Sequence, residues 1–201
     1  IQEWGDWHKQ SRALPDKNRR SDQSLYRTSL TVLKVHEDKH FPGGLIASLS
    51  IPWGMNKSDD DLGGYHLVWP RDLVEAAGGF LAGGCFEDVR RILNYLATTQ
   101  LKDGHWSQNM WLDGTPYWDG IQMDETAFPI LLVDLAIREG ILKKDEFWQM
   151  VFKAVSYLVQ NGPVTQQDRW EEDPGYSPFT LAVEISALLA AADMADSNGH
   201  G

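Results

Sequence analysis

Residues 117–137 read YWDGIQMDETAFPILLVDLAI, an acidic loop with a tryptophan that leads directly into a run of apolar and small residues. From Thr126 to Ile137 the apolar side chains lie on nearly every side of a helix, which is the pattern of a helix that is covered all round. Residues 73–81 and 179–192 have the same character. The sequence therefore predicts three buried helices.

Amphipathic segments alternate with these buried ones. Residues 87–101 place an apolar stripe on one face and space Glu87 and Arg91 for an i,i+4 pair on the other, and residues 144–159 repeat the arrangement. Residues 24–36 carry a further helical pattern, while apolar residues at every second position in 45–51 predict a short strand. Alternation of buried and half-exposed helices predicts helical hairpins stacked side by side.

A loop with a tryptophan and carboxylates precedes each buried helix. Asp124 follows Asp72 by 52 residues and Glu172 follows Asp124 by 48, a repeat length that suits helical hairpins. Stacked hairpins bring such loops together at one end. We therefore expect an all-α toroid with a tryptophan- and acid-rich pit, and a polar linker or arm over residues 1–20.

Composition excludes several classes of protein. With 42% hydrophobic and 23% charged residues, the 201-residue chain can bury a core. Its net charge of −11 repels phosphate backbones and anionic lipid, so neither nucleic acid nor a membrane is an expected partner. No apolar run approaches the roughly 18 residues of a membrane span. The single cysteine, Cys85, allows no intramolecular disulfide.

A pit of carboxylates and indoles suits a neutral substrate rich in hydroxyl groups. Carboxylates accept hydrogen bonds from hydroxyls, and aromatic faces pack against the C–H face of a sugar ring. Cleavage of a glycosidic bond needs one protonated carboxylic acid and a second carboxylate. An apolar neighbour and a second acid both favour the protonated form. Glu171 has both, because it stands between Trp170 and Glu172.

The same residues resemble the glucoamylase family of glycoside hydrolases, in its bacterial glucoamylase and glucodextranase branch. The resemblance rests on Trp69-Pro-Arg71-Asp72, on Trp118 six positions before Asp124, and on Trp170-Glu171-Glu172 ahead of an apolar helix. It implies that residues 21–201 are the N-terminal half of an (α/α)6 catalytic domain, with about six of twelve helices. It also implies release of glucose from non-reducing ends of α-glucans, through α-1,4 or α-1,6 linkages, with inversion, and a secreted or periplasmic protein.

The resemblance also suggests roles for individual residues. Glu171 matches the general acid and Glu172 a carboxylate that holds sugar hydroxyls. The remaining candidates for substrate binding are Tyr65, Trp69, Arg71, Asp72, Trp118, Trp170 and Asp124. Because the family's base lies in the second half of the barrel, we expect it outside these 201 residues. The expected partners are thus an α-glucan and the rest of the chain's own barrel.

Structural interpretations compete with these functional ones. Asp72 and Glu75 fit a capping box, and Asp124 fits a helix cap or an anion near a helix N-terminus. Ser177-Pro178 is typical of an N-cap and a first helical proline. Glu171 and Glu172 could instead form a solvated turn, and the whole chain a non-catalytic, glucan-binding toroid.

Two further motifs concern metals. His36-Glu37-Asp38-Lys39-His40 fits the zinc-peptidase pattern, but Pro42, Gly43 and Gly44 end any helix there, so this activity is a remote alternative. Asp59-Asp60-Asp61 could hold calcium, although three consecutive acids more often form a solvated loop. Glycine pairs at 78–79 and 83–84 favour close helix packing or a C-cap over a phosphate site. We expect no cofactor and no metal in the site.

Overall fold

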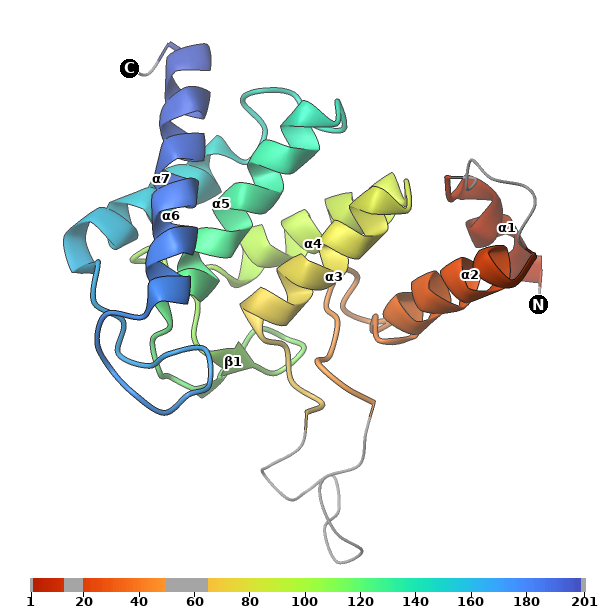
Figure 1. Cartoon of the computed structure of the whole chain (residues 1–201), viewed down its shortest axis with the longest axis horizontal. Helices are drawn as coiled ribbons and strands as arrows, with labels where there is room; N and C mark the ends of the chain where they lie inside the picture. Colours follow the sequence, from red (N-terminus) through yellow and green to blue (C-terminus); the bar gives the residue numbers. More distant parts are fainter. Residues whose placement is uncertain (1, 13–19, 50–64, 200–201) are drawn as a thin grey trace, which may run out of the picture.

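The computed structural model describes residues 2–12, 20–49 and 65–199 and is largely helical there (Figure 1). The elements are α1 (Gln2–Gln10), α2 (Arg20–Val35), α3 (Pro70–Ala82), α4 (Phe86–Thr99), β1 (Asn109–Met110), β2 (Pro116–Trp118), α5 (Met123–Arg138), α6 (Trp148–Asn161) and α7 (Pro178–Ser197). The predicted all-α fold class is confirmed. Each of the six helical patterns found in the sequence corresponds to one of these helices, with ends that differ by a few residues.

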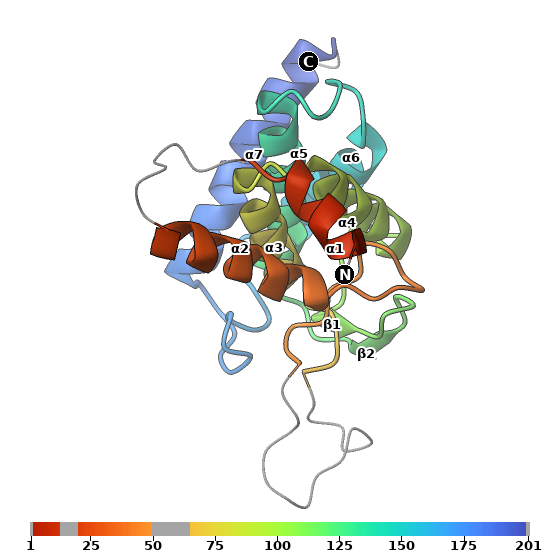
Figure 2. The same cartoon turned by 90° about the vertical axis from the view of Figure 1, so that its right-hand side faces the viewer.

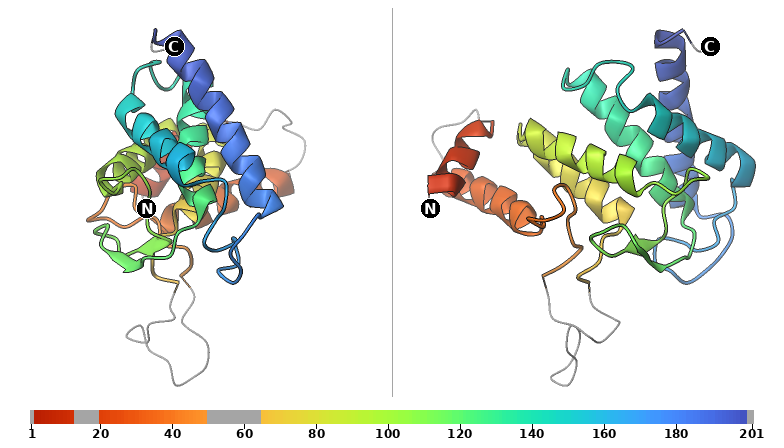
Figure 3. Two further views of the ribbon diagram at one scale, coloured as in Figure 1. Left: turned by 90° about the vertical axis from the view of Figure 1, so that its left-hand side faces the viewer. Right: turned by 180° about the vertical axis from the view of Figure 1, so that it is seen from behind.

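Helices α3, α5 and α7 form an inner layer in which each one packs against the next. Helix α4 packs on α3 and α5, and α6 packs on α5 and α7, so these two helices lie outside the inner layer (Figures 1 and 3). The alternation of buried and amphipathic segments therefore predicts the layers correctly. The inner helices begin at the same end of the layer, where the hairpin of β1 and β2 also lies (Figure 1).

Side-chain burial shows why these segments form these layers. Helix α5 is buried on nearly all sides, including the acidic residues of its first turn, although Leu135 near its C-terminal end is exposed. Helix α4 buries the stripe of Val89, Ile92 and Leu93 and exposes Glu87, as expected for an outer helix. The predicted pair between Glu87 and Arg91 does not form, because Arg91 binds Glu37 and Asp88 instead.

Helix α7 differs from α5 because only one of its sides is covered. Val183, Ala187 and Ala191 are buried toward the layer, whereas Ile185 and Leu189 are 57% and 64% exposed. Contrary to the expectation from apolar runs, its length and composition alone would allow α7 to cross a membrane. Core helices of globular folds pass the same test, and α7 packs extensively on α5.

The predicted strand over residues 45–51 is not present in the part that the structure describes. Leu45 forms an isolated bridge with Glu37, and the amides of Ala47 and Ser48 donate to the carbonyls of Leu67 and Tyr65 over 2.9 and 3.1 Å. Residues 50 and 51 lie outside the described residues, as do Asp59, Asp60 and Asp61. These hydrogen bonds fix the segment that leads into α3.

The short hairpin of β1 and β2 was not predicted. Its strands are antiparallel with an irregularity between Asn109 and Met110, and Met110 forms a bridge with Val68. Strands of two and three residues are too short to show a period in sequence. The hairpin matters for the site because it places Trp118 beside the chain that precedes α3.

Residues 2–10 form helix α1 within the segment interpreted as a linker or arm. Trp7 anchors this helix, since its indole Nε1 donates to Asp88 over 3.0 Å and its ring meets Phe80 edge-on. Figure 2 shows α1 and α2 in front of α3 and α4. A single half-buried tryptophan on a short polar helix gives little periodic signal, so the sequence does not predict this helix.

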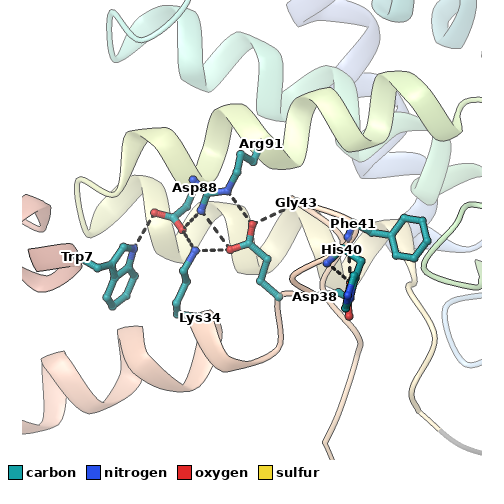
Figure 4. Close-up of polar contacts among 9 residues, drawn as sticks. Trp7, Lys34, Asp38, His40, Phe41, Gly43, Asp88 and Arg91 are labelled. Carbon is teal, nitrogen blue, oxygen red and sulfur yellow. Dashed lines mark hydrogen bonds and ion pairs between the residues drawn. The ribbon is translucent and has the colours of Figure 1, made fainter. Parts of the chain in front are cut away.

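The zinc-peptidase motif does not have the helical geometry that its chemistry requires. Helix α2 ends at Val35, before His36, and Glu37 is paired with Lys34 and Arg91. Lys34 and Arg91 also bind Asp88, which accepts a hydrogen bond from Trp7, and Figure 4 shows these four side chains apart from Asp38 and His40. Within the described ranges, no group of three or more histidine, cysteine, aspartate or glutamate residues could hold a metal ion.

The predicted helix ends had mixed outcomes. Helix α3 begins at Pro70 with Trp69 as its N-cap, so the capping box of Asp72 and Glu75 does not form. The N-cap of α7 is Ser177, whose Oγ accepts from the amide of Thr180 over 3.4 Å, as predicted. One glycine of each pair serves helix packing, because a Cβ at Gly79 or Gly83 would lie 2.7 Å from a side-chain atom of Leu33 or Leu30 on α2, whereas Gly78 has open space around it.

Candidate active site

A pocket of about 510 Å³ lies at the end of the layer where the inner helices begin. Four stretches of chain line it: the chain at Ala47, the segment entering α3 with its first turns, strand β2, and the loop before α7. The lining residues are Ala47, Tyr65, Trp69, Arg71, Asp72, Glu75, Trp118, Arg169, Trp170 and Glu171. Four aromatic rings, three carboxyl groups and two guanidinium groups thus share one pocket.

Glu171 is fixed by a tryptophan from the opposite wall. The indole Nε1 of Trp69 donates to Oε1 of Glu171 over 2.7 Å. Trp69 itself is only 6% exposed and packs against the ring of Tyr65, with ring centres 6.0 Å apart. A rigid, buried donor of this kind orients a carboxyl group better than a solvent-exposed one does.

The loop that carries Glu171 is held in a strained conformation by Asp168. Glu171 has φ of 67°, in the left-handed region that non-glycine residues rarely occupy. Asp168 Oδ1 accepts from the amides of Trp170 and Glu172 over 2.9 and 3.2 Å, and its carbonyl accepts from the amide of Glu171 over 2.9 Å. Asp168 therefore fixes the backbone that presents the candidate acid.

Arg71 on α3 links the start of α5 to the loop before α7. Its Nη1 donates to Gln122 Oε1 over 2.6 Å and to Asp124 Oδ2 over 2.9 Å, while its Nη2 donates to the carbonyl of Arg169 over 3.3 Å. The Arg71 side chain is 12% exposed and that of Asp124 is fully buried. The planar fork of the guanidinium group suits this arrangement, since it reaches several acceptors at once.

The carboxyl group of Asp72 faces the pocket in an electrostatically crowded position. Partial burial raises the pKa of the Asp72 carboxyl group, and the negative charge of Glu75 adds to the rise. The guanidinium group of Arg71 opposes it. Asp72 is nonetheless exposed at the pocket surface. It can therefore hydrogen bond to a hydroxyl-bearing ligand either as an acceptor or, when protonated, as a donor.

The structure brings together most of the residues predicted from the sequence. The predicted residues that line the pocket are Tyr65, Trp69, Arg71, Asp72, Trp118, Trp170 and Glu171. Glu172 is exposed and does not line it. Asp124 lies beneath it as a partner of Arg71, in the first turn of α5 rather than at its cap. The interpretation of Glu171 and Glu172 as one solvated turn fits only Glu172.

Sequence reasoning missed several residues of the pocket and its support. Glu75 and Arg169 line the pocket, and Arg169 stacks its guanidinium on Trp170, 4.6 Å from the ring centre. Gln122 and Asp168 hold other site residues without touching the pocket. Asp168 could have been found, because an aspartate that opens a tight turn is a known signal for such amide contacts. Gln122 and Arg169 carry no comparable signal.

The loops before the inner helices gather aromatic rings and carboxyl groups in one pocket. This arrangement is that of the carbohydrate-active α/α-toroid class. The comparisons with known proteins agree with this class. The model of glycosyl hydrolases family 15 matches residues 20–201, and the chain belongs to this family.

Two relatives resemble the chain over nearly its whole length. It is 43% identical over 193 residues to a glucoamylase of Clostridium sp. (strain G0005), covering 96% of this chain and 27% of that protein. It superposes on a bacterial glucoamylase solved in complex with acarbose with a TM-score of 0.86 and 41% identity, covering 99% of this chain and 28% of that one. The chain thus spans little more than a quarter of either relative.

A third similarity concerns the fold alone. A polysaccharide lyase superposes with a TM-score of 0.61 and 18% identity, over 90% of this chain and 56% of that one. The predicted toroid fragment and its resemblance to the glucoamylase family are therefore confirmed.

Proposed function

We propose that the protein is an exo-acting, inverting α-glucosidase that releases glucose from the non-reducing ends of α-glucans. The observation that carries the proposal is the position of Glu171, which shares one pocket with four aromatic rings and receives a hydrogen bond from Trp69. The relatives support it, since one is a glucoamylase and another is a bacterial glucoamylase that binds acarbose.

In this proposal the terminal glucose packs against the rings of Tyr65, Trp69, Trp118 and Trp170 while Arg71 and Asp72 hold its hydroxyl groups. Glu171 donates its proton to the glycosidic oxygen, and the bond between that oxygen and C1 breaks. A water molecule attacks C1 from the opposite face and gives its proton to a second carboxylate. The family resemblance implies that this base comes from outside the 201 residues.

Asp124 takes part through Arg71, because it is buried and bonded to the guanidinium group rather than facing the ligand. Its role in the proposal is to hold the polar clamp in place. Glu172, which is exposed beside the loop, would meet the sugar only outside the described pocket.

The test is a Glu171→Gln substitution in the protein expressed from its complete reading frame. Hydrolysis of maltose and isomaltose should fall by a factor of roughly 10³ or more, because general acid catalysis and its associated positioning are lost. The affinity for acarbose, measured by calorimetry, should fall as well. Proton NMR of early product should show β-glucose, the anomer that inversion of an α-linkage creates.

Glu87→Gln is the matched control. Glu87 is exposed on α4, whose first turn lies at the opposite end of the layer from the pocket, so this variant should keep full activity. Unchanged acarbose binding in Glu171→Gln, together with an inactive wild-type protein, would instead support a non-catalytic, glucan-binding toroid. Early α-glucose would exclude inversion.

A further inference from the structure

Glu125 lies directly behind the pocket floor and takes no part in the proposed reaction. Its side chain is fully buried, next to Asp124 in the first turn of α5. Its Oε1 is 3.6 Å from Nη1 of Arg71, which is already committed to Gln122 and Asp124 at shorter distances. Glu125 is therefore near the guanidinium group but outside hydrogen-bond distance.

Neither carboxyl oxygen of Glu125 has a hydrogen-bond partner among the described residues. An ionised carboxylate that is buried without donors is costly, whereas the neutral acid is tolerated far better. The backbone is unusual here too, because Pro129 four residues later has no amide to donate to the carbonyl of Glu125. The sequence thus keeps a glutamate where an ionised carboxylate receives no hydrogen bond from a described residue.

Three other carboxyl groups act electrostatically on Glu125. Asp72 on α3 and Glu171 in the loop before α7 act on it, as does Asp124 on its own helix, and Arg71 alone opposes them. Burial raises the pKa of Glu125 well above its ordinary value, and these carboxylates add to the rise. On α7, burial and Asp124 likewise raise the pKa of Glu184.

We propose that Glu125 holds a proton beneath the pocket and acts as a positioning residue that leaves the guanidinium group of Arg71 to Gln122 and Asp124. An ionised Glu125 would compete with these partners for Nη1 and draw the guanidinium group away from the pocket. The role in sugar binding rests on the proposed function. The protonation itself does not.

The first experiment compares thermal stability of the wild type and E125Q across pH, using the whole protein. A carboxyl group whose folded-state pKa is raised stabilises the fold below its unfolded pKa, and this stability is lost as pH rises through the folded value. E125Q cannot ionise. The melting temperature of E125Q relative to that of the wild type should therefore rise with increasing pH.

E87Q is the control, since its melting curve should follow that of the wild type at every pH. The infrared carbonyl band of a neutral carboxylic acid should also be present in the wild type near neutral pH and weaker in E125Q. A melting difference that falls as pH rises, with no change in this band, would show an ionised Glu125 and overturn the proposal. If E125Q does not fold, the same two measurements on E125A, which also cannot ionise, decide between these outcomes.

The second experiment measures steady-state kinetics on maltose. E125Q preserves shape and neutrality, so it should keep KM within about threefold of the wild type. E125A opens a cavity next to Arg71 in which the guanidinium group can shift, so it should raise KM about tenfold with a smaller change in kcat. As pH rises, KM should climb in the wild type and stay nearly constant in E125Q. Equal KM values in E125Q and E125A would contradict the positioning role. If no variant hydrolyses maltose, the stability and infrared results still decide the protonation.

Discussion

The indole Nε1 of Trp69 and Oε1 of Glu171 are 2.7 Å apart, although 102 positions separate the two residues in the chain. Trp69 is the N-cap of α3, and Glu171 lies in the loop that leads into α7. This contact joins the first and last inner helices at the end of the layer where both begin. The stacking of the hairpins therefore fixes the position of the candidate acid, Glu171, next to the rings of Trp69 and Tyr65.

Trp69→Phe should lower kcat/KM on maltose about tenfold or more while leaving the pocket wall apolar. The substitution keeps an aromatic ring and removes the donor to Glu171. A hydrogen bond to the carboxylate that forms as Glu171 gives up its proton contributes roughly 1.5–3 kcal/mol. The loss should appear mainly in kcat, since the bond orients the acid rather than the sugar. Steady-state kinetics on the whole protein measure both parameters.

Trp7→Phe is the matched control, because it also removes one indole donor, here to Asp88, and neither residue lines the pocket. It should lower the melting temperature and leave kcat/KM unchanged. Equal losses of activity in the two variants would mean that the bond between Trp69 and Glu171 has no special role.

The fold could be predicted well because its signal is local and periodic. Apolar residues all round α5 and on one stripe of α4 already separate inner from outer helices. Helix α1 and the hairpin of β1 and β2 could not be predicted, since a short polar helix and strands of two and three residues show almost no periodic spacing of apolar residues. The start of α3 was misplaced because Pro70, rather than Asp72, opens the helix.

The pocket could be predicted less completely, and the reason is physical. Residues that present a ring or a carboxyl group in a loop, such as Trp118 and Glu171, stand out by their type. Residues that act through another side chain do not: Gln122 and Asp168 are recognisable only once Arg71 and the backbone of the loop are seen to need partners. Asp124 was a candidate ligand of the sugar, yet its observed partner is Arg71.

Gly43→Ala should destabilise the protein by at least about 3 kcal/mol, a large effect for one methyl group. Gly43 has φ of 86°, and a Cβ there would lie 2.1 Å from the carbonyl oxygen of Arg91 on α4. Gly140→Ala is the control, because Gly140 has φ of 72° but open space around it. It should cost only the roughly 1–2 kcal/mol of a left-handed residue.

Urea denaturation at pH 7 measures both variants. A Gly43→Ala protein as stable as Gly140→Ala would mean that the loop after α2 can move away from α4 without loss, against the close packing observed.

Glu37→Gln should remove an acid-sensitive part of the protein's stability. Glu37 is 8% exposed in its side chain and is bound by Arg91 and Lys34. Burial alone would raise the pKa of Glu37, but the hydrogen bonds from Arg91 and Lys34 outweigh burial and lower it. A lowered folded-state pKa gives stability that is present above the unfolded pKa and is lost as pH falls through the folded value. The free energy of unfolding of the wild type should therefore exceed that of Glu37→Gln by about 2 kcal/mol at pH 7. This difference should shrink as pH falls below the ordinary glutamate pKa of about 4.3.

Urea denaturation at a series of pH values measures the difference between wild type and Glu37→Gln. Glu87→Gln is the control variant and should show no such difference. A gap that stays constant down to the acid transition would show that Glu37 contributes by packing rather than by its charge.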